Sequence, residues 1–216
     1  MKFRWNMIFL LLWMLLLLYS FILAPGSIED SFTLLMEMMT DPGSVEPLVF
    51  SIFNLLGVWP MVYAAVILFE GRGKGLRSWP FVIGSFFTGA FSLLPYLGLR
   101  RPQIDFKGKK SFLLRVLDSR AYGIVLKLVG ISLLAYGIGA GNWSTYMELF
   151  RTNMLVHVMT VDLMVVTLAF PCVMRDDMRR RGWHGIGRFL LFALLPLIGP
   201  LTYLWMRPHQ EDAGQE

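Results

Sequence analysis

The chain has 216 residues, of which 56% are hydrophobic and only 16% are charged. Soluble domains carry roughly 25% charged residues, so this composition excludes an ordinary soluble protein and favours a single-domain polytopic membrane protein. The net charge of +5 does not indicate nucleic-acid binding, because the aromatic residues lie inside apolar runs. Since Cys172 is the only cysteine, an intrachain disulfide and a cysteine-based metal cluster are also excluded.

Six apolar segments are long enough, or nearly so, to cross a hydrocarbon core, which needs roughly 20 apolar residues. The sequence therefore predicts an all-α bundle of about six hydrophobic helices, with one or two amphipathic helices on the membrane surface. The first segment follows two basic residues like a signal peptide, but its apolar core is long, so we expect an uncleaved anchor, with cleavage as the alternative. The predicted helices cover residues 5–24, 47–69, 79–99, 121–140, 154–174 and 189–206.

Three polar segments connect or follow these helices. The acidic segment 25–46 has apolar residues at helical spacing, from Ile28 to Met39, and predicts a helix lying on the membrane surface. The connection 100–120 is basic and amphipathic, which favours contact with anionic lipid headgroups; a solvated connector is the alternative. A polar tail follows over residues 207–216.

The basic residues predict how the chain is oriented, because lysine and arginine concentrate in cytoplasmic loops. Two arrangements satisfy this rule. In one, all six segments cross and the N-terminus is outside. In the other, segment 79–99, which contains Gly84, Gly89 and Pro95, enters the membrane and returns. Both arrangements put the basic connections 99–120 and 175–188 on the cytoplasmic face and the C-terminal tail on the other face.

Two stretches of the chain resemble each other. Asn54, a basic loop, Trp79 and "SLLPYLGLRRP" echo Asp162, a basic loop, Trp183 and "ALLPLIGPLTYLWMRP". Inverted repeats of three helices are typical of transporters. The spacings differ, however, with 41 residues from Asn54 to Pro95 and 34 from Asp162 to Pro196. The alternative is two unrelated proline-containing helices that both end in arginine.

Asp162 stands out because it lies in the apolar run "LVHVMTVDLMVV". An ionised carboxylate at the centre of a spanning helix costs at least roughly 2.5–3.5 kcal/mol, so we expect it to face the bundle interior and to have a partner. The predicted partner is Lys127, and failing that Asn54 or Tyr96. His157 is not expected to join Asp162 in a catalytic or metal pair, since five residues separate them by about 140° around the helix.

Lys127 lies on a stripe of small residues. Gly123, Gly130 and Gly137 recur every seven residues and let a neighbouring helix approach closely. Lys127 is four residues after the first of these glycines, so we expect it to point into the bundle. The alternative is that its side chain extends to the lipid headgroups.

The string "RDDMRRRG" is the densest polar cluster. Asp176 and Asp177 are the residue types that hold Mg²⁺ for a diphosphate substrate, but the chain has no second acidic cluster. We therefore expect a solvated loop in which both carboxylates partly neutralise the arginines. We find no phosphate-binding loop and no nucleophile motif, and we expect no cofactor.

Several strings, taken in order, resemble an uncharacterised family of multispan membrane proteins that is widespread in cyanobacteria and has chloroplast members. They are "FNLLGVWPMVYAAVILFEGRG", "WPFVIGSFFTGAFSLLPYLGLR", "LDSR", "HVMTVD", "RDDMRRRG" and "PLIGPLTYLWMRP", and they cover most of Phe53–Pro208. The resemblance implies a thylakoid or plasma membrane location and no particular activity.

The sequence favours a non-catalytic role, as an accessory or assembly factor of a membrane complex. Its expected partners are the lipid bilayer, anionic headgroups at the basic loops and a membrane protein complex, and no nucleic acid. A small-solute or ion transporter using Asp162 and Lys127 is one alternative. A lipid or isoprenoid enzyme using Asp176 and Asp177 is the other.

Overall fold

A computed structural model describes residues 2–70, 76–101 and 109–211, and this part of the chain is helical without strands. The all-α fold class is thereby confirmed for these residues. Four helical stretches are long and apolar enough to cross a membrane. They are α1 (Lys2–Leu18) with its π-helical extension η1 (Tyr19–Leu23), α3 (Pro47–Ile67), α7 (Arg120–Ala140) and α9 (Met154–Arg180).

The other two predicted spans are not single helices, so the count of six long helices is not confirmed. For segment 79–99 the break agrees with the alternative arrangement, in which this segment enters the membrane and returns. Segment 79–99 forms α4 (Trp79–Thr88) and α5 (Ala90–Leu99), which meet at Gly89 with a φ of 53°. Segment 189–206 falls within α10 (Ile186–Ala193) and α11 (Ile198–Met206). A helix of ten residues is about 15 Å long, half the thickness of a hydrocarbon core.

Each of these helix pairs folds back on itself as a hairpin. In the α4–α5 hairpin, the rings of Phe81 and Tyr96 lie 5.5 Å apart, although they are near the opposite ends of the segment. In the α10–α11 hairpin, Phe192 and Tyr203 have ring centroids 5.8 Å apart. Both hairpins therefore begin and end at the same end of the bundle. Residue 207 lies at this end, together with the basic connections, so the predicted placement of the tail on the opposite face is wrong for this residue.

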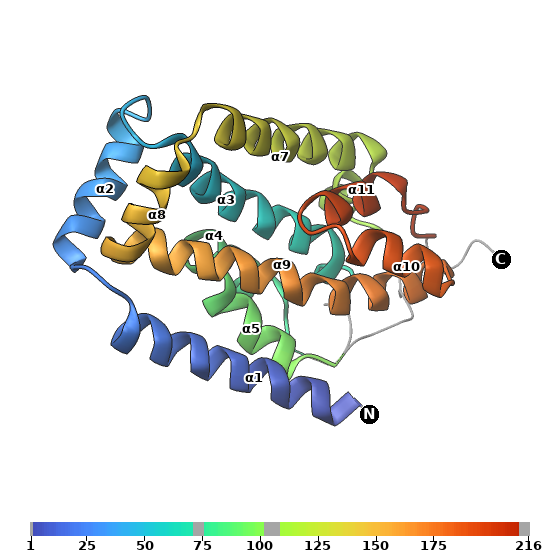
Figure 1. Cartoon of the computed structure of the whole chain (residues 1–216). Coiled ribbons are helices and arrows are strands. Elements are labelled where there is room, and N and C mark those ends of the chain that lie inside the picture. The colour runs from blue at the N-terminus through green and yellow to red at the C-terminus, as the bar shows by residue number, and fades with distance from the viewer. Residues whose placement is uncertain (1, 71–75, 102–108, 212–216) are drawn as a thin grey trace.

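The two central helices, α3 and α9, run parallel. The Tyr63 hydroxyl donates to the Val166 carbonyl at 2.7 Å, and Arg180 donates to the Val66 carbonyl at 3.2 Å, so the C-terminal halves of both helices lie together. Helix α7 runs antiparallel to α3, because Tyr122 at its start donates to the Met61 carbonyl. Figure 1 shows the long helices side by side, with the start of α1 and the end of α11 near one end of the bundle.

Helix α1 packs antiparallel against α5. The Trp13 indole donates to the Phe91 carbonyl at 2.9 Å, and the Asn6 amide donates to the Arg100 carbonyl at 3.2 Å. Two amphipathic helices, α2 (Ile28–Thr40) and α8 (Trp143–Thr152), lie at the opposite end of the bundle from the termini (Figure 1). The predicted helix within segment 25–46 is thus present as α2. The basic connection 100–120 contains the short helix α6 (Phe112–Leu117).

The glycine stripe on α7 has the packing role that its spacing predicts. A side chain at Gly123 would collide with the backbone of Leu204 and Trp205, and one at Gly130 would collide with Leu201. These contacts bring α7 and α11 close together. Lys127 does face this interface, as predicted, and its ammonium nitrogen lies 4.5 Å from the centroid of the Trp205 ring.

The chain contains an internal repeat, in a register that the sequence comparison missed. Each half has a long helix, a surface helix, a second long helix and a hairpin: α1–α2–α3–α4/α5, then α7–α8–α9–α10/α11. Matching positions are 107 residues apart, as the first residues of α3 and α9 show. Because the hairpins open at the same end, we infer a parallel repeat about an axis along the bundle, and not the inverted repeat considered from the sequence.

Candidate functional site

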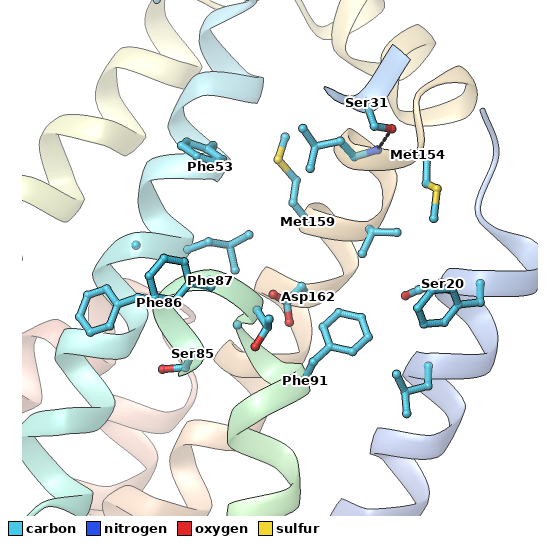
Figure 2. A pocket seen from close by; sticks show the side chains of 18 of the residues that line it. Ser20, Ser31, Phe53, Ser85, Phe86, Phe87, Phe91, Met154, Met159 and Asp162 are labelled. Atoms are coloured by element: carbon cyan, nitrogen blue, oxygen red, sulfur yellow. Dashed lines mark hydrogen bonds between the residues drawn. The ribbon is translucent and has the colours of Figure 1, made fainter. Parts of the chain in front are cut away.

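A cavity of about 730 Å³ lies between α1, α2, α3, α9 and the tip of the α4–α5 hairpin. This volume is within the roughly 300–1,000 Å³ of typical small-molecule sites. Its walls are mainly apolar, and Figure 2 shows Phe53, Phe86, Phe87, Phe91, Met154 and Met159 around it. Phe21 and Phe87 line it with largely exposed rings, so the cavity opens to the side of the bundle.

Asp162 lies at the base of this cavity and is 5% exposed. Its Oδ1 accepts a hydrogen bond of 2.7 Å from the backbone N–H of Ala90, the first residue of α5. A helix that begins inside the bundle leaves its first N–H groups without partners, and its positive end favours a carboxylate. Asp162 therefore caps α5 from a different helix, about 12 Å along α9 from its start.

The predicted partners of Asp162 are elsewhere, so the proposed ion pair with Lys127 is wrong. Lys127 lies against Trp205 in the α7–α11 interface. Asn54 lines the cavity but donates its amide to the Phe50 carbonyl of its own helix, and Tyr96 donates to Glu70. The aspartate is stabilised by a backbone N–H and a helix terminus instead of by a cation.

Two oxygen atoms at the cavity lack hydrogen-bond donors in the described part of the chain. The Ala90 N–H donates to Oδ1 of Asp162, and no described residue donates to Oδ2 of that carboxylate. The Ser20 hydroxyl of η1 is buried and also has no partner. The Ser20 hydroxyl is a buried polar atom without a partner, which costs free energy, and Asp162 lines the cavity, so both oxygens can accept hydrogen bonds from a ligand there.

The second half of the chain shows that the hairpin architecture does not need this carboxylate. The residue that matches Asp162 in the first half, 107 positions earlier, is Leu55, which is 3% exposed. At the α10–α11 tip, backbone N–H groups donate to carbonyl groups of the tip itself. There the Ile198 N–H donates to the Pro196 carbonyl and the Gly199 N–H to the Leu195 carbonyl, at 2.7 and 2.8 Å. The carboxylate is thus a feature of one half only.

A network of buried ion pairs occupies the other end of the bundle. Asp177 is fully buried and accepts hydrogen bonds of 2.8–2.9 Å from three arginines and one of 2.7 Å from the Tyr203 hydroxyl. Glu70, just after α3, accepts from Arg100 at 2.5 Å and from Arg180 at 3.0 Å. The arginines that donate to Asp177 are Arg180, Arg181 and Arg207.

The prediction of a solvated "RDDMRRRG" loop is therefore wrong for Asp177. Asp176 is half-buried and pairs with Arg100 at 2.8 Å, so both carboxylates are neutralised by arginines. No group of three potential metal ligands occurs among the residues described. The network also joins the two basic connections, because Arg181 pairs with Asp118 at 2.6 Å. The two connections thus share one end of the bundle, as the sequence predicts.

The carboxylates of this network stabilise the charge of Arg181. Burial lowers the pKa of the Arg181 guanidinium, but the carboxylates of Asp177 and Asp118 outweigh burial and raise this pKa above its ordinary value. Sequence reasoning missed Glu70, Arg100 and Arg207. The sequence did contain a signal for them. Each half has an acidic residue that is followed by a tyrosine 26 residues later and by an arginine 30 residues later, and the two sets are 107 residues apart.

His157 is separate from Asp162, as the helical spacing predicts. Its ring stacks against Phe150 with centroids 4.3 Å apart, and its Nδ1 hydrogen-bonds to the Phe150 carbonyl at 2.7 Å. Its Nε2 hydrogen-bonds to the Tyr19 hydroxyl. His157 thus joins the end of α1 to α8 and α9, next to the cavity, without facing it.

Comparisons with protein-family models, with curated proteins and with solved structures find no match for this chain. The resemblance to a cyanobacterial membrane family therefore stays a prediction. The function has to be argued from the cavity and the residues around it.

Proposed function

We propose that this protein is an integral membrane protein that binds a hydrophobic small molecule with one amine or other hydrogen-bond-donating group. The observation that carries the proposal is the buried Asp162 carboxylate, whose Oδ2 has no donor among the described residues, at the base of an apolar cavity. The apolar walls suit the body of the ligand, and Asp162 suits its polar group. A ligand with a carboxylate of its own would be repelled.

In the arrangement we propose, the four long helices cross the membrane and both hairpins enter and return at the end with the ion network. Arg151 is the single described lysine or arginine at the α2–α8 end and Lys127 lies within α7, whereas the other fifteen of the seventeen in the described ranges lie at the network end. The positive-inside rule makes the network end cytoplasmic, and the start of α1 and the end of α11 lie there. The cavity then opens to the outer leaflet. Labelling of single cysteines introduced at Arg115 and Glu148 in a Cys172→Ser background tests this, since modification of both from one side contradicts it.

Binding is better supported than passage through the protein. Between Asp162 and the ion network, the rings of Trp59, Tyr63 and Phe170 pack with centroids 5.4–5.9 Å apart, and all three are buried. This packing leaves no evident path for a transported solute, which weakens the transporter alternative. The enzyme alternative loses support because Asp176 and Asp177 are paired with arginines. The accessory role stays a prediction, since no described residue points to a particular partner.

The test uses three probes with one shape and different polar groups: anthracenemethylamine, anthracenemethanol and anthracenecarboxylate. We expect the purified protein to bind the amine most tightly, the alcohol less tightly and the carboxylate least, as measured by probe fluorescence. Asp162→Leu, which copies Leu55, should remove the preference for the amine and weaken its binding by roughly tenfold or more, because a charge-assisted hydrogen bond is lost.

The control is Asn54→Leu, which also replaces a polar residue of the cavity wall with leucine but leaves Asp162 intact. We expect this variant to keep the order of the three probes. If Asp162→Leu keeps that order too, or if the wild-type protein binds the three probes equally, the proposal is overturned.

A further inference from the structure

The arginines around the α9–α10 connection divide into two groups. Arg180 and Arg181 point inward, and their side chains are fully buried in ion pairs with Asp177 and other carboxylates. Arg175, Arg179 and Arg188 are exposed, and no carboxylate of the described residues lies within ion-pair distance of them. Because Asp176 is engaged by Arg100, the outward-facing group keeps its positive charge uncompensated.

Two of these outward-facing arginines line another cavity, of about 180 Å³, at the network end. Arg175 and Arg179 line it together with His184, and no acidic residue does so. Trp183 and Phe189 form its apolar side. Arg188, in the first turn of α10, lies just outside.

Aromatic rings hold two of these guanidinium groups in position. The Arg188 guanidinium carbon lies 5.8 Å from the centroid of the Trp183 ring, and that of Arg175 lies 6.0 Å from the Phe189 ring. A guanidinium that lies over a ring still has N–H donors at its edge. Arginine donors of this kind match the oxygens of a phosphate group, often with two hydrogen bonds at once.

We propose that Arg175, Arg179 and Arg188, together with Trp183, bind the phosphate group of an anionic phospholipid. Trp183 fits such a site, since tryptophan is enriched where membrane meets water. Next to it, α10 exposes Ile186, Leu190 and Leu191, which can lie against the acyl chains. The inference that the phosphate belongs to a lipid depends on the membrane arrangement proposed above. The inference that these arginines bind a phosphate group does not depend on it.

The experiment compares two variants that each lose three positive charges at the same end of the bundle. The first replaces Arg175, Arg179 and Arg188 with glutamine. The matched control replaces Arg101, Arg115 and Arg120, which are also exposed. Each full-length protein is titrated with phosphatidylglycerol in phosphatidylcholine nanodiscs, and bound lipid is counted by native mass spectrometry. We expect roughly tenfold weaker phosphatidylglycerol binding for the first variant and less than about twofold for the control.

Glycerol phosphate, which is soluble in water, distinguishes the two sources of the phosphate. Competition by glycerol phosphate that depends on Arg175, Arg179 and Arg188 supports a phosphate site open to soluble ligands, and phosphatidylglycerol binding without such competition supports a lipid site. Equal losses in both triple variants overturn the proposal, because they indicate attraction by net charge alone. If the first triple variant fails to fold, Arg188→Gln is compared with Arg115→Gln under the same criteria. Anthracenemethylamine binding by the Arg188→Gln variant reports on the Asp162 site independently.

Discussion

The two halves of the chain are alike at the end of the bundle with the ion network and differ at their hairpin tips. In the first half, Glu70 accepts hydrogen bonds from Tyr96 and Arg100; in the second, Asp177 accepts them from Tyr203 and Arg207. Both sets join the end of a central helix to the last turn of the hairpin that follows it. Their presence in both halves, at one offset, indicates a structural role in holding each hairpin closed.

The tips differ because only the first one depends on a side chain from the other half. Asp162 reaches the tip of α5, whereas the matching Leu55 is an ordinary buried leucine. The ion pairs that both halves share therefore belong to the architecture. The Asp162 cap, which occurs in one half only, is the better candidate for a functional feature. Variants at matching positions of the two halves distinguish these two kinds of feature through their effect on stability.

The largest effect is expected for Asp177→Asn. This change leaves Arg207 buried without a carboxylate partner in the described chain, whereas Arg180 and Arg181 keep Glu70 and Asp118. Breaking a buried ion pair typically costs about 3–5 kcal/mol, so we expect a loss of unfolding free energy of this order, measured by denaturation in detergent. Asp177→Asn combined with Arg207→Met should recover much of that loss.

The matching change in the first half, Glu70→Gln, should cost less. Its two arginines keep other carboxylates, since Arg100 pairs with Asp176 and Arg180 with Asp177. An equal or larger loss for Glu70→Gln would show that the number of remaining partners does not control stability in this network.

An intermediate effect is expected at the hairpin tips. Gly89 has a φ of 53°, and a side chain there would collide with the Asp162 carboxylate. Gly89→Ala should therefore cost about 1–3 kcal/mol and also displace Asp162, so that binding of the amine probe weakens. The residue 107 positions later is Pro196, which is exposed, whereas the positive φ at this second tip belongs to Leu197, the residue before α11. Pro196→Ala should change stability by less than about 1 kcal/mol. Thermal unfolding of both variants measures the difference.

A suitable control is Gly139→Ala, on a glycine of α7 that has open space around it. It should be neutral or slightly stabilising, because alanine favours a helix. If Gly89→Ala behaves like this control, the tip does not constrain Asp162 as described.

The smallest effects are expected for the two tyrosines. The Tyr203 hydroxyl donates to Asp177 at 2.7 Å, and the Tyr96 hydroxyl donates to Glu70 at 3.3 Å. Tyr203→Phe should cost about 1–2 kcal/mol, and Tyr96→Phe less than about 1 kcal/mol, because the longer hydrogen bond is weaker. Chemical denaturation of the two single variants in parallel checks the order, and a reversed order would contradict the comparison between the halves.

Composition and periodicity by themselves determined the fold class, the four long apolar helices and the close packing of α7. The Gly123–Gly130–Gly137 stripe, for example, predicts a close neighbour without any knowledge of the partner, because small residues at helical spacing have the same consequence in any bundle. The basic connections were also assigned correctly to one end, since charge placement depends on the membrane and not on tertiary contacts.

The tertiary structure alone decided what the polar residues do. Hydropathy cannot distinguish a spanning helix from a hairpin of equal length, because both bury apolar side chains in the same core. The sequence therefore left both alternatives open for α4–α5, where Gly89 permits a break, and predicted α10–α11 as a single span. Asp162 caps α5 because Ala90, 72 positions earlier, lies against it in the fold. Asp177 is buried because Arg207, 30 positions later, and Tyr203 reach it from beyond the α10–α11 hairpin tip. A partner at that distance in the chain is fixed by how the helices pack, and local sequence does not encode it.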